Sequence, residues 1–272
     1  MLIGMTSDLH IDINEAYPIM DELAKLVRET RLDVLLIAGD ISENAEQTLR
    51  ALNQLEQATG CTIYFVPGNH DMWDKQNGKA HVRPTDEIYE TYKASKYCIS
   101  EKAIELKDDW VLIGNIGWYD YSFGTGYSKE EYEAMQHGGR TWNDHMYSDW
   151  TKDNEKTQKW QMETLRNAIA PHREKHKILM THMVSHTAFT VPLDWSETVS
   201  WASFNAFLGS SEYTRFCEEE KIDYALMGHV HYRGEYKEGA TTYVCSCLNY
   251  QKEWQSSDLT KELALSLRVI TI

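Results

Sequence analysis

Val66-Pro67-Gly68-Asn69-His70-Asp71 is the stretch that decides how this chain folds. The apolar run before it, residues 61–66, is typical of a buried strand, and the Pro-Gly pair then turns the chain sharply. The turn presents an amide, an imidazole and a carboxylate in succession. On their own, these side chains could belong to a polar loop with a capping Asn. Their significance comes from other segments of the chain that end in the same way.

Several further apolar runs are followed directly by metal-binding residue types. They end in Asp8-Leu9-His10, Gly39-Asp40, Thr181-His182 and Gly228-His229-Val230-His231. In open α/β sheets, ligands bind beyond the carboxyl ends of the strands, so parallel strands would bring these side chains to one edge. Carboxylate, amide and imidazole groups suit Zn, Mn or Fe, and a carboxylate can bridge two such ions roughly 3.5–4 Å apart. We therefore expect a binuclear metal site that can clamp a phosphoryl group.

The order of the expected elements predicts an α/β fold. Helical spacing at 19–28 and 45–58 separates apolar runs at 1–6, 34–38 and 61–66, a strand–helix–strand pattern typical of an at least partly parallel sheet. Later in the chain we expect a hairpin, a helix, two more strands that end in His residues, and antiparallel strands at the C-terminus. The hairpin is expected at 103–106 and 110–113, and the helix at 155–170. The two strands that end in His residues are expected at 177–180 and 223–227, and the C-terminal strands at 234–237, 241–247 and 263–270.

Composition limits the possible functions. The net charge is −15, which argues against tight binding of nucleic acid, since that affinity comes mostly from Lys and Arg at phosphates. No apolar stretch is long enough to span a membrane, and the N-terminal residues resemble a core strand rather than a secretory signal. The 5 cysteines favour reduced structural thiols over a disulfide framework. We expect a cytoplasmic protein made of a single domain, 1–272, and the sequence leaves its oligomeric state open.

Residues 117–152 differ from the rest because aromatic residues alternate there with Gly, His and Asp and periodicity is weak. A long irregular stretch in a compact domain is usually functional or disordered, and the many aromatics argue against disorder. We interpret it as an excursion that forms a lid or cap over the mouth of the site; an aromatic satellite core without a ligand role is the alternative. The candidate substrate contacts are Trp118, Tyr119, Arg140, His145 and His186. The other histidines, such as His81, receive no role.

The blocks quoted above resemble, in order, those of the calcineurin-like metallophosphoesterases. The matching blocks run from residue 8 to residue 231. The resemblance implies a four-layer α/β/β/α sandwich of two mixed sheets, with a binuclear site at the strand ends. It also implies two divalent or trivalent ions, Mn, Fe or Zn. Within this family, the sequence resembles small bacterial phosphoesterases of the class III cyclic nucleotide phosphodiesterase type.

The resemblance implies a role for each matched residue. Asp8, His10 and His231 correspond to ligands of one metal; Asn69, His182 and His229 correspond to ligands of the other; Asp40 corresponds to the bridge. His70 corresponds to a residue that protonates the leaving oxygen or stabilises the transition state, and Asp71 would orient its ring.

The implied activity is hydrolysis of a phosphomonoester or phosphodiester of a small phosphorylated molecule or nucleotide by a metal-bridging hydroxide. The chain departs from the protein phosphatases of the family after Gly39-Asp40, where it continues Ile41-Ser42-Glu43-Asn44. It also lacks the Asn that the cyclic nucleotide enzymes often carry before His182. The substrate is therefore not transferable. The alternatives are a non-catalytic metal-binding scaffold of the same fold and a nuclease.

Overall fold

The computed structural model describes residues 1–75 and 83–272, and two mixed sheets form its centre. The first sheet has the order β12-β1-β2-β3, with bounds Arg268–Thr271, Leu2–Thr6, Val34–Ala38 and Thr62–Val66. The second has the order β10-β11-β9-β8-β5-β4, with bounds Arg233–Glu238, Thr241–Ser246, Tyr224–Met227, His176–Thr181, Trp110–Asn115 and Ala103–Glu105. A small separate hairpin pairs β6 (Gln136–His137) with β7 (Arg140–Thr141).

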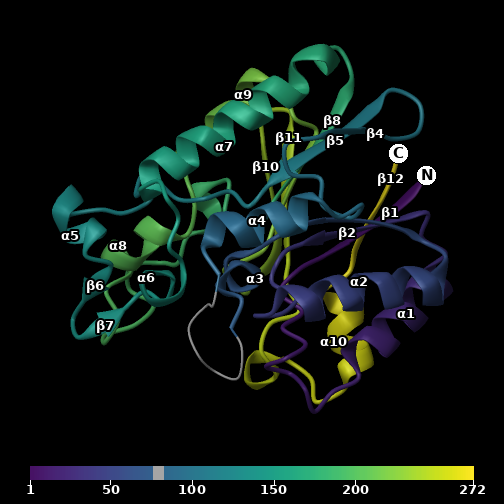
Figure 1. Cartoon of the computed structure of the whole chain (residues 1–272), viewed down its shortest axis with the longest axis horizontal. Helices are drawn as coiled ribbons and strands as arrows, with labels where there is room; N and C mark the ends of the chain where they lie inside the picture. Colours follow the sequence, from purple (N-terminus) through teal and green to yellow (C-terminus); the bar gives the residue numbers. More distant parts are fainter. Residues whose placement is uncertain (76–82) are drawn as a thin grey trace.

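Helices cover the outer faces of both sheets. The longer ones are α1 (Ile19–Thr30), α2 (Ala45–Thr59), α4 (Thr85–Lys93), α7 (Asn154–Ile169), α9 (Ser211–Glu219) and α10 (Leu259–Leu265). The shorter ones are α3 (Asn69–Trp73), α5 (Lys129–Glu133), α6 (Asp144–Tyr147) and α8 (Trp201–Phe204). Figure 1 shows α1 and α2 along one side and α7 and α9 along the other, with the sheets between them. The predicted four-layer α/β/β/α sandwich is confirmed.

The side chains of β2 show why the layers stack in this order. Leu35 and Ile37 belong to the apolar cluster beneath the helices on the first sheet. Val34, Leu36 and Ala38 belong instead to the cluster between the sheets, together with residues of β8 and β9. Alternate residues of a strand point to opposite faces, so a strand that is apolar throughout can be buried on both sides.

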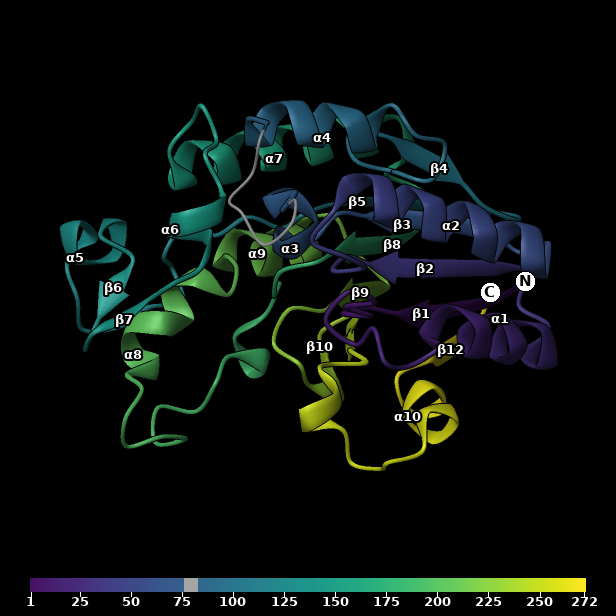
Figure 2. The same cartoon turned by 60° about the horizontal axis from the view of Figure 1, so that its bottom comes forward.

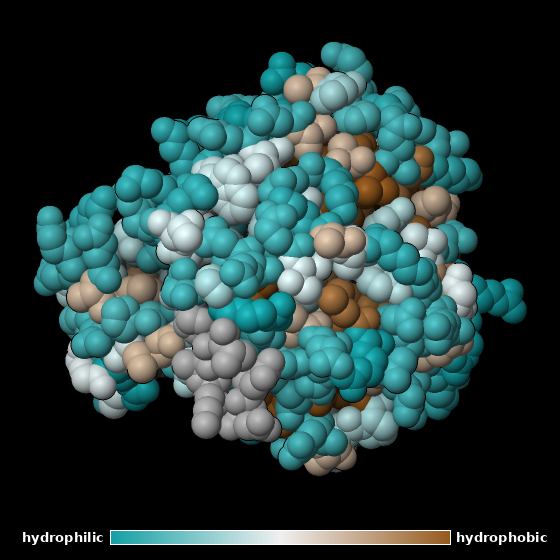
Figure 3. All heavy atoms as spheres, in the orientation of Figure 1, coloured by the Kyte–Doolittle hydropathy of each residue, from teal (hydrophilic) through white to brown (hydrophobic). Residues whose placement is uncertain are grey.

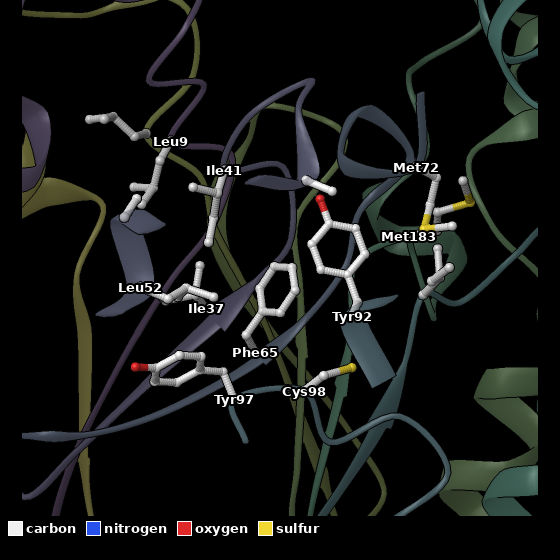
Figure 4. Close-up of a cluster of buried hydrophobic side chains, with 14 of the residues drawn as sticks. Leu9, Ile37, Ile41, Leu52, Phe65, Met72, Tyr92, Tyr97, Cys98 and Met183 are labelled. Carbon is white, nitrogen blue, oxygen red and sulfur yellow. The ribbon is translucent and has the colours of Figure 1, made fainter. Parts of the chain in front are cut away.

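The cluster under the first sheet's helices also anchors the loops beyond the strands. Figure 4 shows Phe65 and Ile37 packed with Leu52 of α2 and Tyr92 of α4. The hydroxyl of Tyr92 donates to the backbone carbonyl of Asp71 at 3.2 Å. This packing ties the turn after β3 to the core.

The C-terminal strands differ in part from the sequence-based expectation. Residues 263–265, predicted as the beginning of the strand 263–270, instead end the helix α10, which Asp258 caps by accepting from the Thr260 backbone N–H at 3.0 Å. Leu259 and Leu263 are buried with helical spacing. The strand β11 is antiparallel to β10 but parallel to β9.

The parallel pairing of β1, β2 and β3, and of β5, β8, β9 and β11, points their carboxyl ends in the same direction within each sheet. On the face shown in Figure 3, hydrophilic residues dominate and apolar residues reach the surface in small areas. Among the described residues, no helix has the length and apolar character that a membrane crossing requires.

Candidate metal centre

Every predicted ligand lies just beyond the carboxyl end of a strand. Asp8 and His10 follow β1, Asp40 follows β2, and Asn69 begins α3 after β3. In the second sheet His182 directly follows β8, and the ligands His229 and His231 follow β9. The two sheets therefore deliver their polar residues to one place, as the strand-end rule predicts.

Most of these residues have left-handed backbone conformations. Their φ angles are +53° at Asp8, +43° at His10, +55° at Asp40, +71° at His229 and +55° at His231. Such conformations are uncommon for residues other than glycine, and each costs on the order of 1–3 kcal/mol. Strain of this kind persists where the surroundings fix the chain, and it is concentrated here at the predicted ligands.

Two glycines allow the loops to approach closely. A Cβ on Gly68 would lie 2.1 Å from the Oδ1 of Asp40, and one on Gly228 would lie 2.4 Å from the Oδ2 of Asp8. Neither position can hold a side chain without displacing a carboxylate. The Gly residues before Asn69 and His229 are thus required by the spacing between the loops.

Asp8, His10 and His231 form the first group of donors. The Nε2 of His231 lies 3.5 Å from the Oδ1 of Asp8, and the Nε2 atoms of His10 and His231 are 3.3 Å apart. Asn69, His182 and His229 form the second group: the Oδ1 of Asn69 is 3.1 Å from both the Nε2 of His182 and the Nδ1 of His229.

Asp40 lies between the two groups. Its Oδ2 is 3.3 Å from the Nε2 of His182 and 3.8 Å from the Nε2 of His10. Ligand atoms at about 2.0–2.2 Å from one ion lie roughly 3 Å or slightly more from each other, as these do. The donors are carboxylate and amide oxygens and imidazole nitrogens, and they therefore fit transition-metal ions. Asp40 is placed so that it could contact an ion in each of the two donor groups.

The electrostatics of the cluster favour a bound cation. Burial and the neighbouring His70 lower the pKa of His10 well below its ordinary value, and burial and His182 do the same to the pKa of His229. Neutral imidazole is the form that binds metals. Burial opposes a charge on His182, but the adjacent Asp40 outweighs it and raises the pKa of His182 to about 10. A metal would take the place of that proton, since metal binding releases protons from its ligands.

The partner of His70 is Glu43 and not Asp71. The Oε1 of Glu43 lies 3.1 Å from the Nδ1 of His70, while the opposite ring nitrogen is 3.4 Å from the hydroxyl of Tyr250. The expectation that Asp71 orients this ring is wrong. Consecutive residues of a helix project in different directions, and His70 and Asp71 are neighbours in α3.

Asp71 instead holds two loops together. Its fully buried carboxylate accepts backbone N–H bonds from Asp40 at 2.7 Å and from Gly68 at 2.8 Å, and a hydroxyl bond from Thr48 at 3.0 Å. Burial and the nearby Asp40 raise the pKa of Asp71 to about 7. Asp71 therefore fixes the position of the Asp40 loop relative to the turn after β3.

Asp144, from the excursion at 117–152, contacts a predicted ligand directly. Its Oδ1 accepts from the Nδ2 of Asn69 at 2.9 Å and from the indole of Trp73 at 2.8 Å, and its Oδ2 accepts from the indole of Trp142 at 2.8 Å. Because the Asn69 amide nitrogen is bound to Asp144, the amide oxygen faces His182 and His229. Burial raises the pKa of Asp144, and these hydrogen bonds oppose the rise.

The cluster opens into a cleft of about 720 Å³. Asp40, Asn69, His70, His229 and His231 line it, whereas Asp8, His10 and His182 are fully buried beneath them. Of the predicted substrate contacts, Arg140 lines this cleft.

The other predicted contacts lie elsewhere, and their interpretation as substrate contacts at this cleft is corrected. Trp118 and Tyr119 are fully buried in the core, and the indole of Trp118 donates to the Oδ1 of Asn154 at 2.8 Å. His145 borders a separate cavity of about 320 Å³. His186 is nearly buried beside Tyr243 and approaches Glu238 at 3.3 Å, outside the cleft. His81 lies outside the described residues.

Sequence reasoning missed Glu43, Asp144 and Tyr250. Glu43 lies on the loop that begins at Asp40, so an acidic residue shortly after a predicted ligand was an available signal. The ring centroid of Tyr250 is 4.6 Å from those of both His10 and His231. Tyr250 and Asp144 reach the site only through tertiary packing, and no local pattern marks them.

Comparisons with known proteins agree with this architecture. A phosphopantetheinyl hydrolase from Mycobacterium tuberculosis is similar in structure, with a TM-score of 0.74, 17% sequence identity, and coverage of 98% of this chain and 95% of that chain. A protein of Thermus thermophilus has a TM-score of 0.53 at 14% identity and 98% and 97% coverage. A dimetal phosphatase from Danio rerio has a TM-score of 0.50 at 12% identity and 90% and 86% coverage. No curated protein matches the sequence significantly.

At these identities the structural matches establish the fold alone. The family is established by the sequence, because the family model for calcineurin-like phosphoesterases matches residues 1–233. That match includes every strand-end block described above. The chain therefore belongs to the calcineurin-like phosphoesterases, the metal-dependent enzymes that hydrolyse phosphate esters.

Proposed function

We propose that this protein uses two transition-metal ions to hydrolyse a phosphomonoester or phosphodiester bond of a small phosphorylated molecule. One ion would be held by Asp8, His10 and His231, and the other by Asn69, His182 and His229. The carboxylate of Asp40 would contact both ions. The observation that carries the proposal is the position of Asp40, whose Oδ2 lies within 3.8 Å of the Nε2 atoms of His10 and His182, one from each donor group.

The bound ions, Mn, Fe or Zn, would supply an activated water and neutralise the phosphate oxygens. The residues of the chain supply the rest. His70 borders the cleft with its ring 4.8 Å from that of His10, and it can donate a proton to the leaving oxygen. Glu43 holds the ring by its Nδ1 and so directs the Nε2 towards the open cleft.

The location in the cell and the choice among alternatives are part of the same proposal. All 5 cysteines are free and buried, as expected for a protein of the reducing cytoplasm. The complete set of donors, together with the paired His70 and Glu43, favours an enzyme over a non-catalytic scaffold. The net charge of −15 disfavours a nuclease.

Hydrolysis of p-nitrophenyl phosphate and bis-(p-nitrophenyl) phosphate by the Mn²⁺-loaded protein tests the proposal. His70→Ala should lower kcat by about 10²-fold or more because it removes the proton donor, while the metal content measured by elemental analysis stays at the wild-type value. His176→Ala is a matched control, because His176 lies at the opposite end of β8 from His182. Unchanged kcat in His70→Ala, or no hydrolysis of either ester by the wild type, would contradict the proposal.

A further inference from the structure

The cleft above the metal centre is much larger than a phosphoryl group requires. Its volume of about 720 Å³ lies within the range of sites that bind whole organic ligands, about 300–1,000 Å³. The donors of the metal centre account for part of its lining. The remaining wall shows which kind of molecule is attached to the phosphate.

A second irregular segment, 191–208, forms one side of that wall with apolar side chains alone, while Arg140, Arg233 and Glu253 contribute charged groups elsewhere in the lining. The residues that it contributes to the cleft are Val191, Trp195, Val199, Trp201, Phe204 and Leu208. Figure 2 shows α8, which lies in this segment, near the β6–β7 hairpin and beyond the ends of the strands. The part of the substrate that contacts this side of the wall should therefore be apolar rather than a sugar or a second phosphate.

Rings in close succession connect this wall to the metal centre. The ring of Trp142 is 5.8 Å from that of the predicted ligand His229 and 6.2 Å from that of Phe204. The ring of Phe204 is in turn 6.5 Å from that of Trp201. An organic group bonded to a phosphate at the metal centre would therefore extend along an apolar surface that begins at the centre itself.

Part of this wall is exposed to solvent. Trp195 is 67% exposed although it is one of the largest apolar side chains of the segment. Contact with an apolar group would remove its surface from water, at a gain of roughly 25 cal/mol per Å² of apolar area. The exposed indole would thus add to the affinity for an apolar substituent.

We propose that the substrates are phosphate esters that carry an extended apolar group, aryl or alkyl, which lies against Trp142 and the 191–208 wall while the phosphate occupies the metal centre. This inference rests on the proposed function and specifies its substrate class. It commits the wall to a part of the substrate, because wall and metal centre line one continuous cleft.

Calorimetric titration of the Mn²⁺-loaded protein with methyl-, hexyl- and phenylphosphonic acid tests the inference without turnover. These phosphonates share the phosphate-like group and differ in the apolar substituent. Hexyl- or phenylphosphonate should bind at least about tenfold more tightly than methylphosphonate, since each buried methylene adds affinity. The tighter of the two shows whether the wall prefers alkyl or aryl groups.

Trp195→Ala should lower the affinity for the preferred phosphonate about 3- to 10-fold more than that for methylphosphonate. Leu265→Ala, an exposed apolar residue of α10 outside the cleft, is the control and should leave the ratio unchanged. Equal affinities for the three compounds would overturn the inference and leave the proposed function intact. If none of them binds and neither p-nitrophenyl ester is hydrolysed, the proposed function fails and the inference with it.

Discussion

The two walls of the cleft are built in different ways. One consists of loops that leave parallel strands. Its polar residues Asp8 and Asp40 are buried, His229 is half-buried, and all three have left-handed backbone conformations. The other consists of two irregular segments, 140–144 and 191–208, whose cleft-lining side chains are mainly aromatic and aliphatic. The sheet edge thus positions the candidate metal ligands, whereas segments inserted between the strands shape the space for the substrate.

Asp144 links the two walls of the cleft, so their roles are not fully separate. It belongs to the irregular wall, yet its carboxylate binds the amide of Asn69 on the other wall. Its third donor, Trp142, lines the cleft. Asp144 is therefore the residue through which substitutions in one wall should affect the other.

The largest effect is expected at Asp40. Asp40→Ala removes the carboxylate that lies between the donor groups, so both ions should bind weakly and activity should fall by at least about 10³-fold. Elemental analysis of the purified variant measures the loss. Full occupancy at two ions per chain would show that Asp40 is not shared.

The second largest effect is expected at Asp144, although this residue lies outside the strand-end loops. Asp144→Ala leaves the amide of Asn69 free to rotate, so metal affinity should fall about 10- to 100-fold, as expected for a residue that orients a ligand. Titration of the metal-free protein with Mn²⁺ measures this. Asp109→Ala, at an exposed turn before β5, serves as the control. Wild-type affinity in Asp144→Ala would mean that the two walls are independent.

A smaller loss is expected at Glu43. Glu43→Gln replaces the carboxylate beside His70 with a neutral group that holds the ring less firmly, and kcat should fall by about tenfold with KM and metal content nearly unchanged. Steady-state kinetics separate these quantities. The corresponding replacement of a carboxylate by an amide at Asp71, Asp71→Asn, should instead lower the free energy of unfolding, because it weakens hydrogen bonds to two loops. A loss of kcat alone at Asp71 would restore the role first expected for it.

The smallest kinetic effect is expected at Trp118, which lies in the excursion but not in the cleft. Trp118→Phe removes the hydrogen bond to Asn154 and part of the buried indole, so the free energy of unfolding should fall by about 1–3 kcal/mol. Urea denaturation measures this loss. Values of kcat/KM should stay within about twofold of the wild type, and a larger fall in kcat/KM than the loss of stability explains would indicate a substrate contact.

The sequence was sufficient for the features that follow from strand topology. Parallel strands that end in Asp, Asn and His must bring those residues to one edge, so the fold and the gathering of donors could be predicted. Features that depend on side-chain direction could not. Residues adjacent in sequence need not contact each other: α3 projects the side chains of His70 and Asp71 in different directions, and the partner of His70 is Glu43.

The irregular segments were harder to interpret for a similar reason. An aromatic composition does not distinguish a buried residue such as Trp118 from a cleft residue such as Trp142, because both need apolar surroundings. The bond from Asp144 to Asn69 joins positions 75 residues apart, and no periodic pattern predicts it. Only the packing of the excursion against α3 reveals it.

The central claim is that two ions share Asp40 at the edge where the two sheets meet. Anomalous diffraction from crystals of the Mn²⁺-loaded protein tests it most directly. We expect two peaks about 3.5–4 Å apart, one beside Asp8, His10 and His231 and the other beside Asn69, His182 and His229, with Asp40 in contact with both. A single peak, or two peaks of which one does not contact Asp40, would contradict it.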